Sequence, residues 1–326
     1  MQTLAITGVG GFIGKRLAER ALERGFTVRG LEVSAEAAAR AEGLGVQVVV
    51  GDITDPAAAA RMCEGADAVV HTAAIVREDG PWDLFRRVNV EGAETVARAA
   101  RDAGVRRFVH LSSVMVYGFH YPPGVDEEGP LRGDGNPYCT TKIESEAALL
   151  AFQQNGDLDV VLVRPGDVYG PGSQPWVVRP IELMKARLIV LPRRGHGYMN
   201  PVYVDNLIDG LFLALATEHT GQAFNITDGR AVTYMDYFSR LARAAGVPGP
   251  WTAPEPLLRA AFQAVERGAV LLGKTPLAHA QALNYLIRPG SYSIEKARQR
   301  LGYEPAVSFE EGMRLTEAWI QQEDLP

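Results

Sequence analysis

The chain of 326 residues is long enough for one large domain or two smaller ones, and its 47% hydrophobic and 22% charged residues are the balance of an ordinary globular protein. Its formal net charge of -6 excludes the strongly basic field of a nucleic acid binding protein. The two cysteines, Cys63 and Cys139, exclude a disulfide scaffold or a thiolate metal cluster and suit a reducing cytoplasm, so we expect a cytoplasmic protein without a metal site.

Six short apolar segments in the N-terminal half predict buried β-strands. They cover residues 3–7, 27–33, 46–50, 66–74, 106–113 and 158–165. The stretches between them have helical spacing and close on glycines that can cap a helix. This alternation predicts an α/β protein with a Rossmann doubly wound parallel sheet. We expect no signal peptide before the first strand and no membrane span, because no uncharged apolar run reaches roughly 18 residues.

The alternation ends near residue 170, and from about residue 230 the pattern is mostly helical. We therefore predict two domains. The NAD-binding Rossmann domain is expected to contain residues 1–170 and about 201–228. A smaller, mostly helical and discontinuous substrate-binding domain is expected to contain about 171–200 and 229–326.

A glycine-rich loop, ITGVGGFIG, directly follows the first predicted strand and opens the first helix. Glycines there permit a tight turn and a close approach of the backbone to a pyrophosphate, which the free N–H groups of the helix N-terminus can bind. The strand–loop–helix context makes this a dinucleotide site rather than a chance glycine triplet. The predicted cofactor contacts in the loop are Gly8, Gly11, Phe12, Ile13 and Gly14.

Two carboxylates follow the next strands. Glu32 ends the second strand, where it can accept both ribose hydroxyls of NAD and would repel the 2′-phosphate of NADP. Arg29 and Ser34 lie nearby and could help a phosphate, so NAD is preferred over NADP without excluding it. After the third strand, Asp52 could meet the adenine amino group and Ile53 could pack on the ring, although a turn aspartate would look the same.

Tyr138 and Lys142 are four residues apart on a predicted helix, and Ser113 ends the fifth strand at the sheet edge where ligands of such folds bind. A tyrosine has an unperturbed pKa near 10, and a neighbouring ammonium favours its phenolate. The phenolate could take a proton from a substrate hydroxyl while hydride passes to NAD⁺. Ser113 would hold the same oxygen, and Lys142 could also bind the nicotinamide ribose. These three residues are the predicted catalytic group.

Several motifs together resemble the extended short-chain dehydrogenase/reductases, the NAD-dependent epimerase/dehydratase superfamily. In order, they are TGVGGFIG, GDITD, HTAA, NVEG, HLSSVMVYG, YCTTK, RPGDVYGPG and VYVDN, with LGYEPAVSFEEGMRLTEAWI near the C-terminus. The resemblance covers essentially the whole chain. It implies a Rossmann domain, a smaller C-terminal substrate domain and the Ser–Tyr–Lys roles just described.

The resemblance also implies further cofactor-site residues. HTAA would run beside the dinucleotide, Asn89 would be a structural or proton-relay asparagine, and two residues of RPGDV would pack near the nicotinamide, although ordinary strand-end packing would give the same pattern. The additional predicted contacts are Thr72, Ala73, Ala74, Asn89, Pro165 and Val168.

Two positions separate this chain from members that act on nucleotide-sugars. Asp167 stands where those enzymes usually have an asparagine for the substrate diphosphate, and a carboxylate there is a like-charge clash. Met199 is the nearest equivalent of an arginine that those enzymes commonly have, although Arg193 and Arg194 could substitute. The chain instead looks like the 3β-hydroxysteroid/sterol dehydrogenase branch and its 3-oxoacid-reductase-like relatives.

Residues 254–286 fit that branch, with an apolar stripe of Leu257, Leu258, Ala261, Phe262 and Val265. Such a stripe usually packs against its own domain, but it could also wall an apolar pocket or touch a membrane surface. The tryptophans Trp82 and Trp176, in loops near the sheet edge, are candidate substrate contacts together with Asp167 and Met199.

These features predict an NAD(P)-dependent oxidoreductase that interconverts a secondary alcohol and a ketone on a mainly apolar small molecule. One alternative is a nucleotide-sugar 4-epimerase or dehydratase, although Val114 and Met115 stand where dehydratases often have an acidic pair. Another is a non-catalytic dinucleotide-binding regulator, a class that tends to lose the Tyr–Lys pair. By analogy, a homodimer is expected, with Ala147, Ala148, Leu150 and Ala151 as an apolar helix face.

Overall fold

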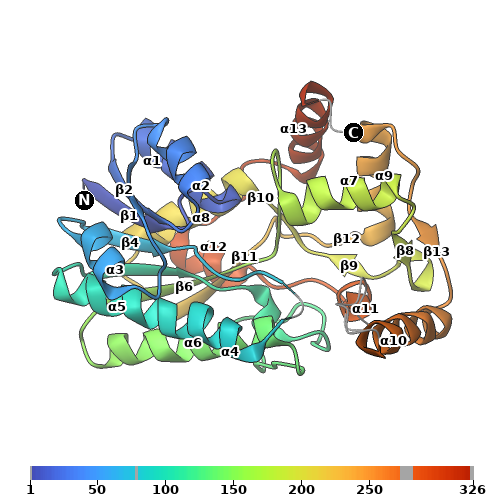
Figure 1. Cartoon of the computed structure of the whole chain (residues 1–326), viewed down its shortest axis with the longest axis horizontal. Coiled ribbons are helices and arrows are strands. Elements are labelled where there is room, and N and C mark those ends of the chain that lie inside the picture. The colour runs from blue at the N-terminus through green and yellow to red at the C-terminus, as the bar shows by residue number, and fades with distance from the viewer. Residues whose placement is uncertain (1, 78–79, 272–281, 324–326) are drawn as a thin grey trace.

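The computed structural model describes residues 2–77, 80–271 and 282–323 (Figure 1). The strands are β1 Thr3–Thr7, β2 Thr27–Glu32, β3 Gln47–Val50, β4 Ala68–His71, β5 Arg107–Leu111, β6 Asp159–Pro165, β7 Asp167–Tyr169, β8 Val190–Leu191, β9 Tyr198–Met199, β10 Pro201–Tyr203, β11 Gln222–Ile226, β12 Val232–Thr233 and β13 Trp251–Thr252. The α-helices are α1 Phe12–Glu23, α2 Ala35–Glu42, α3 Pro56–Cys63, α4 Trp82–Phe85, α5 Gly92–Asp102, α6 Pro137–Gln154, α7 Arg179–Lys185, α8 Val204–Ala216, α9 Tyr234–Ala245, α10 Glu255–Leu271, α11 Ala282–Tyr285, α12 Glu295–Leu301 and α13 Phe309–Gln322. Short π-helical and 3₁₀ turns are η1 Arg86–Glu91, η2 Val114–Tyr117, η3 Gln174–Val178 and η4 Arg193–Gly195.

Seven parallel strands form the main sheet, in the order β11-β6-β5-β4-β1-β2-β3. The six strands predicted from apolar segments all form, and the prediction of a doubly wound Rossmann fold is confirmed. The seventh strand, β11, was not predicted from the sequence. It is short, and its fourth residue is Asn225, whose side-chain oxygen accepts a hydrogen bond from Tyr117 at 2.8 Å. A buried polar residue with a distant partner interrupts the apolar run by which strands are recognised.

The alternation of side chains along each strand divides the core between the two faces of the sheet. Leu4 and Ile6 of β1 belong to the cluster that includes α1 and α8, whereas Ala5 packs in the cluster that includes α3, α5 and α6. Both faces are therefore covered by helices, as a parallel sheet requires (Figure 1).

The C-terminal domain is mostly helical, as predicted, and lies beside the sheet with α7, α9 and α10 (Figure 1). Small two-stranded pairs, β9 with β12 and β8 with β13, tie its segments together. The pair β7–β10 joins residues on either side of the predicted 171–200 insertion. The exact domain bounds stay a prediction. No helix among the described residues is both long and apolar enough to cross a membrane.

The apolar stripe predicted on residues 254–286 falls largely on α10, and residues 272–281 lie outside the described residues. Leu258 is buried and Phe262 half-buried, but Leu257, Ala261 and Val265 are exposed. The stripe is thus only partly covered by its own domain.

A buried ion pair fixes α6 to the sheet. The Arg164 guanidinium of β6 donates two hydrogen bonds to the Glu146 carboxylate, at 2.8 and 2.6 Å, and a third to the Tyr117 hydroxyl at 2.8 Å. Both side chains of the pair are at most 5% exposed. Such a pair is weak evidence for net stability, but losing one partner leaves an uncompensated buried charge.

Replacing Glu146 with glutamine should lower the free energy of unfolding by about 3 kcal/mol or more, because Arg164 keeps its charge in a buried site. Glu144 on the same helix is the matched control, since its ion pair with Arg86 is partly exposed. Glu144→Gln should cost about 1 kcal/mol or less. Urea unfolding at pH 7.5 measures both, and equal losses would contradict the assigned role of the buried pair.

Candidate active site

The glycine loop forms a narrow cradle between β1 and α1. Gly8 has φ of +66°, and a Cβ there would meet the Ala73 backbone at 3.2 Å. A Cβ on Gly14 would overlap the carbonyl oxygen of Gly8. Gly11 is the N-cap of α1 and has no side chain to bind the first N–H groups. Glycine is therefore required on steric grounds at Gly8 and Gly14, and the residues present fit a dinucleotide pyrophosphate.

Phe12 and Ile13, the next two residues, are half-buried at the start of α1 and pack against the core on the α1 face of the sheet. Their packing anchors the glycine loop to the core.

Glu32 lies at the carboxyl end of β2 and is 9% exposed. Its two carboxylate oxygens accept hydrogen bonds from the backbone N–H groups of Gly10 at 3.0 Å and Ser34 at 3.1 Å. The carboxylate is thereby held beside the glycine loop. By contrast, Arg29 is committed elsewhere, because its guanidinium donates to the carbonyl oxygens of Arg61 and Met62.

Asp52 is exposed, and its Oδ1 accepts hydrogen bonds from the backbone and hydroxyl of Thr54 at 2.9 Å each. This is the arrangement of a turn aspartate, the alternative left open by the sequence. Ile53 is buried, and it lies so close to Gly92 of α5 that a Cβ there would come within 2.8 Å of it.

The segment Thr72–Ala74 leaves the carboxyl end of β4 next to the glycine loop. The Thr7 hydroxyl accepts the backbone N–H groups of Thr72 and Ala73, each at 3.1 Å, and the Thr72 hydroxyl donates to the Thr7 carbonyl at 2.6 Å. All three residues of the segment are half-buried. The geometry brings them and the glycine loop together at one sheet edge.

Ser113, Tyr138 and Lys142 come together at the carboxyl end of β5. Ser113 caps the turn η2, with its hydroxyl accepting the Met115 N–H at 3.1 Å. Tyr138 and Lys142 lie one turn apart on α6, which starts with Asn136 as N-cap and Pro137 in its first turn. Tyr138 is 8% exposed, and the Lys142 ammonium lies 5.9 Å from the centre of its ring.

Burial dominates the acid–base properties of this group. It raises the pKa of Tyr138 to about 12, and the hydrogen bond with Ser113 opposes that shift. Burial also lowers the pKa of Lys142 to about 8, while the charge of Glu146 one turn away raises it. The Lys142 ammonium donates to the Leu111 carbonyl at 2.7 Å. In the chain by itself, desolvation of the phenol therefore outweighs any favourable effect of the lysine on the phenolate.

Asn89 is buried in the π-helical turn η1. Its side-chain oxygen accepts the Ile75 N–H at 2.7 Å, and its amide donates to the Ile75 carbonyl at 3.2 Å and the Thr141 hydroxyl at 3.1 Å. It thus links the segment after β4 to the helix that carries Tyr138. This geometry matches a structural asparagine.

Pro165 and Val168 flank the position that the sequence singled out, Asp167, at the end of β6 and in β7. Asp167 is not a free carboxylate. Its Oδ2 accepts a 2.5 Å hydrogen bond from the guanidinium of Arg288 and a 2.7 Å bond from the Asn200 backbone. The sequence predicted a like-charge clash between Asp167 and a substrate diphosphate. In the structure the charge of Asp167 is neutralised by Arg288.

The Arg288–Asp167 pair adjoins the catalytic group. Arg288 is 1% exposed, also donates to the Tyr234 hydroxyl at 2.5 Å, and approaches the Met115 sulfur at 3.8 Å. Met115 packs in one cluster with Tyr138. Sequence analysis missed Arg288 and Tyr234, because Arg288 lies 121 residues from its carboxylate partner and belongs to no recognised motif.

The remaining candidate substrate contacts lie in different surroundings. Met199 is buried in the core, and Trp82, at the start of α4, is 43% exposed. Trp176 is half-buried and stacks on Tyr234 with ring centres 6.3 Å apart, so it is connected through Tyr234 to Arg288. Met199 also lies near the Asp167–Arg288 pair, because the backbone N–H groups of its neighbours Tyr198 and Asn200 donate to the Arg288 carbonyl and the Asp167 carboxylate.

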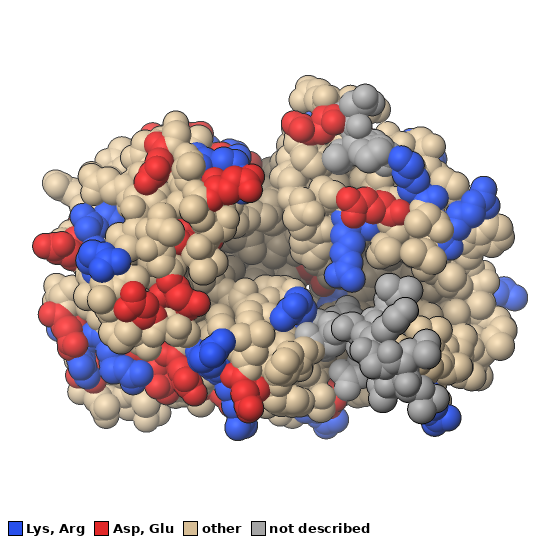
Figure 2. Space-filling view, viewed as in Figure 1, with Lys and Arg blue, Asp and Glu red and all other residues tan. Residues whose placement is uncertain are grey.

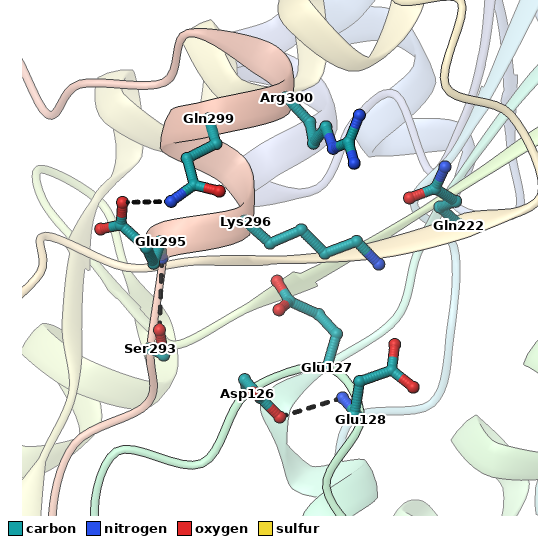
Figure 3. Close-up of a pocket in the computed structure, with 9 residues that line it drawn as sticks. All are labelled: Asp126, Glu127, Glu128, Gln222, Ser293, Glu295, Lys296, Gln299 and Arg300. Carbon is teal, nitrogen blue, oxygen red and sulfur yellow. Dashed lines mark hydrogen bonds between the residues drawn. The ribbon is translucent and has the colours of Figure 1, made fainter.

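Figure 2 shows a hollow between the sheet domain and the C-terminal domain. A separate polar pocket of about 400 Å³ lies elsewhere, between β11, α12 and residues 126–128 (Figure 3). None of the predicted catalytic residues lines it. Glu127, whose carboxylate accepts the Asn225 backbone N–H at 2.7 Å, lies opposite Lys296 there. This pocket is a charged crevice at the β11 edge of the sheet.

The model of the NAD dependent epimerase/dehydratase family matches residues 4–227. This chain belongs to that family.

Two curated relatives and one solved structure illustrate the similarity. A 2-alkyl-3-oxoalkanoate reductase of Stenotrophomonas maltophilia is 31% identical, over 97% of this chain and 98% of its own. A 3 beta-hydroxysteroid dehydrogenase/Delta 5-->4-isomerase of Mycobacterium tuberculosis is 33% identical, over 94% of this chain and 87% of its own length. The dTDP-glucose 4,6-dehydratase DesIV of Streptomyces venezuelae, solved with NAD bound, superposes with a TM-score of 0.78 at 26% identity, over 99% and 97%.

The chain is thus an NAD(P)-dependent oxidoreductase of the extended short-chain dehydrogenase/reductase type, as the motifs predicted.

This family member also buries two histidines beneath Lys142. His71 of β4 and His110 of β5 are adjacent in register and stack with ring centres 5.5 Å apart. His71 shares a hydrogen bond with the Thr7 hydroxyl at 2.9 Å and His110 one with the Ser145 hydroxyl at 3.1 Å, but the other nitrogen of each ring has no hydrogen-bond partner among the described residues. Burial, and then the charge of Lys142, lowers the pKa of His71 to about 3 and the pKa of His110 well below its ordinary value.

These histidines should make the protein acid-labile. A base with a depressed pKa in the folded state binds its proton mainly after unfolding, so stability is full above pH 6.5 and falls as the pH drops below it. Each histidine should lower the free energy of unfolding by about 1.4 kcal/mol for each pH unit below 6.5. Urea unfolding measures the free energy of unfolding at pH 7.5 and at pH 4.5. The decrease between the two pH values should be smaller by roughly 2–3 kcal/mol in His110→Asn than in the wild type. Carboxylates that titrate in this range are common to both proteins, so their contribution cancels in the comparison. Equal decreases in the free energy of unfolding in the two proteins would contradict the assigned role of His110.

Proposed function

We propose that this protein interconverts a secondary alcohol and a ketone on a mainly apolar substrate, with NAD as cofactor and Ser113, Tyr138 and Lys142 as catalytic residues. The observation that carries the proposal is the buried Tyr138–Ser113 hydrogen bond beside Lys142, at the carboxyl edge of the sheet and on the same edge as the glycine cradle. This edge is where doubly wound sheets bind their ligands.

Bound NAD supplies the hydride acceptor or donor. The chain supplies the proton transfer: the Tyr138 hydroxyl gives its proton to a ketone oxygen, or takes one from a carbinol, while Ser113 donates a hydrogen bond to the same oxygen. Lys142 places a positive charge within one helical turn, which stabilises the phenolate. Asn89 holds α6 in place through Thr141.

Glu32 supports NAD over NADP. Its carboxylate is fixed beside Gly10 by a 3.0 Å hydrogen bond, at the end of the second strand, where a 2′-phosphate would meet a negative charge. Arg29 does not offset it, because its guanidinium is bound to two backbone carbonyls.

The surroundings of Tyr138 support an apolar substrate. The tyrosine packs in a cluster with Phe85, Met115 and Phe119, and Tyr285 lies against Phe119 at 4.9 Å between ring centres. The nearby Arg288 is neutralised by Asp167. Such a site favours a steroid-like, sterol-like or 3-oxoacyl compound over an anionic diphosphate.

We also propose a cytoplasmic homodimer through α5 and α6. Ala147 and Ala151 are exposed on α6, with Ala148 and Leu150 half-buried beside them.

Purified protein should oxidise 3β-hydroxysteroids or reduce 3-oxoacyl compounds in an NAD(H)-dependent manner, with a higher kcat/KM for NAD than for NADP. Absorbance at 340 nm measures both. Turnover of UDP- or dTDP-hexoses in place of these compounds would favour the rival function of a nucleotide-sugar epimerase or dehydratase. Tight NAD binding without turnover of either class would favour a regulator.

Tyr138→Phe should lower kcat by about 10²–10⁴-fold, the usual contribution of a positioned acid–base group, because it removes the hydroxyl to which we assign the proton transfer. The NAD dissociation constant, measured by calorimetry, should change little. Tyr198→Phe, which removes the hydroxyl of a partly exposed tyrosine in β9, is the control and should retain activity. Equal losses of turnover and NAD binding in Tyr138→Phe would contradict the catalytic role.

A further inference from the structure

Four large apolar side chains are exposed on the C-terminal domain, at the end that holds β8, β13 and α10. Their exposed fractions are 67% for Leu188, 53% for Trp251, 63% for Leu257 and 44% for Val265. Isolated exposed apolar residues are ordinary, but a group of them on one part of a surface marks an interaction site.

The segments that carry these residues are joined. The Trp251 N–H donates to the Ile189 carbonyl at 3.0 Å, so Leu188 and Trp251 lie on neighbouring segments of the chain. Arg193, after β8, donates to Glu255 at the start of α10 at 2.7 Å. We call the surface formed by residues 187–194 and 251–267 the apolar–basic corner.

Helix α10 presents one exposed apolar stripe in this corner. Leu257, Ala261 and Val265 are spaced four residues apart and all are exposed, so they lie along one side of the helix. Leu258, on the adjacent side, is buried and holds the helix to its domain. The stripe therefore faces away from the protein.

The same region is positively charged in an acidic protein. The apolar–basic corner contains five Arg against two Glu, a difference of +3, whereas the whole chain has a formal charge of -6. Figure 2 shows basic side chains outnumbering acidic ones on the visible face of this domain. The Arg187 guanidinium lies 5.8 Å from the centre of the exposed Trp251 ring, so charge and apolar surface are in direct contact.

We propose that the apolar–basic corner docks on a lipid surface that contains anionic lipids. Apolar side chains with interspersed arginines are the composition of an interfacial contact: the apolar groups enter the headgroup boundary, a tryptophan prefers that depth, and the basic groups meet lipid phosphates. The reason for such a surface rests on the proposed function, because a steroid-like or long-chain substrate partitions into lipid. The corner lies on the substrate domain, so docking brings that domain to its substrate.

The contact is expected to be reversible and strongly dependent on lipid charge. Each basic residue near an anionic surface is worth about fivefold in binding. The four exposed apolar side chains add to this but bury far less surface than a spanning helix.

Flotation with vesicles tests the proposal directly. Full-length protein should float with vesicles of 70% phosphatidylcholine and 30% phosphatidylglycerol, and should remain with the soluble fraction in pure phosphatidylcholine or in 0.5 M NaCl. The double substitution Trp251→Asp/Leu257→Asp should lower binding at least tenfold, and Arg187→Glu/Arg194→Glu should do the same. All four side chains are exposed, so folding should be unaffected, and circular dichroism verifies this.

Val33 and Val50 provide the matched control, since they are 68% and 51% exposed on the sheet domain. Val33→Asp/Val50→Asp should float like the wild type. Turnover of a water-soluble short-chain substrate without vesicles should be unchanged in the corner variants, which separates this proposal from the proposed function.

Three outcomes would overturn the proposal. One is equal flotation with neutral and anionic vesicles, and another is wild-type binding by the Trp251 and Leu257 variant. The third is a change of molar mass in solution on substituting the corner, measured by light scattering, which would assign the surface to contact between copies of the chain. The NAD-dependent activity would stand in each case.

Discussion

The site depends on one constraint: helix α6 buries polar side chains where most helices bury apolar ones. Tyr138, Lys142, Ser145 and Glu146 are all nearly inaccessible to water and follow one another around the inner side of the helix. Each must find a partner inside the protein, because an unpaired buried polar group is costly. The partners are Ser113, the Leu111 carbonyl, His110 and Arg164, and all four belong to β5, β6 or the residue pair that follows β5. The helix can therefore sit against the sheet in only one register.

This arrangement explains why the chemistry and the stability of the protein are connected. The charge of Glu146 raises the pKa of Lys142, and Arg164 neutralises Glu146. Burial keeps the two histidines beneath Lys142 uncharged, and the charge of Lys142 adds to that effect. A substitution in this group changes the electrostatic surroundings of the tyrosine as well as the packing of the helix. The glycine cradle on β1 and α1 is independent of it and depends on backbone sterics alone.

Local patterns made much of this foreseeable. Apolar runs marked six of the seven main strands, and Gly8 and Gly14 were recognisable because their requirement is steric and local. The distant pairings were not foreseeable, since nothing near Asp167 in sequence indicates Arg288. The sequence also indicated a lysine that lowers the tyrosine pKa, whereas in the structure burial of the phenol is the larger effect. A spacing of four residues reports proximity but not the depth of burial that decides the sign of a pKa shift.

The order of strands along the chain has a consequence for synthesis. Strand β6 pairs with β11, and Val161 of β6 is in register with Gln222 of β11. The segment between the two strands contains part of the C-terminal domain, so β6 is synthesised well before its partner. A nascent chain that has emerged only as far as β6 exposes that strand as an open hydrogen-bonding edge of apolar residues. Open edges of this kind pair readily with other chains. A fragment ending near residue 170 would hence be prone to aggregate, and the chain must be synthesised as far as Ile226 before β11 covers that edge of β6.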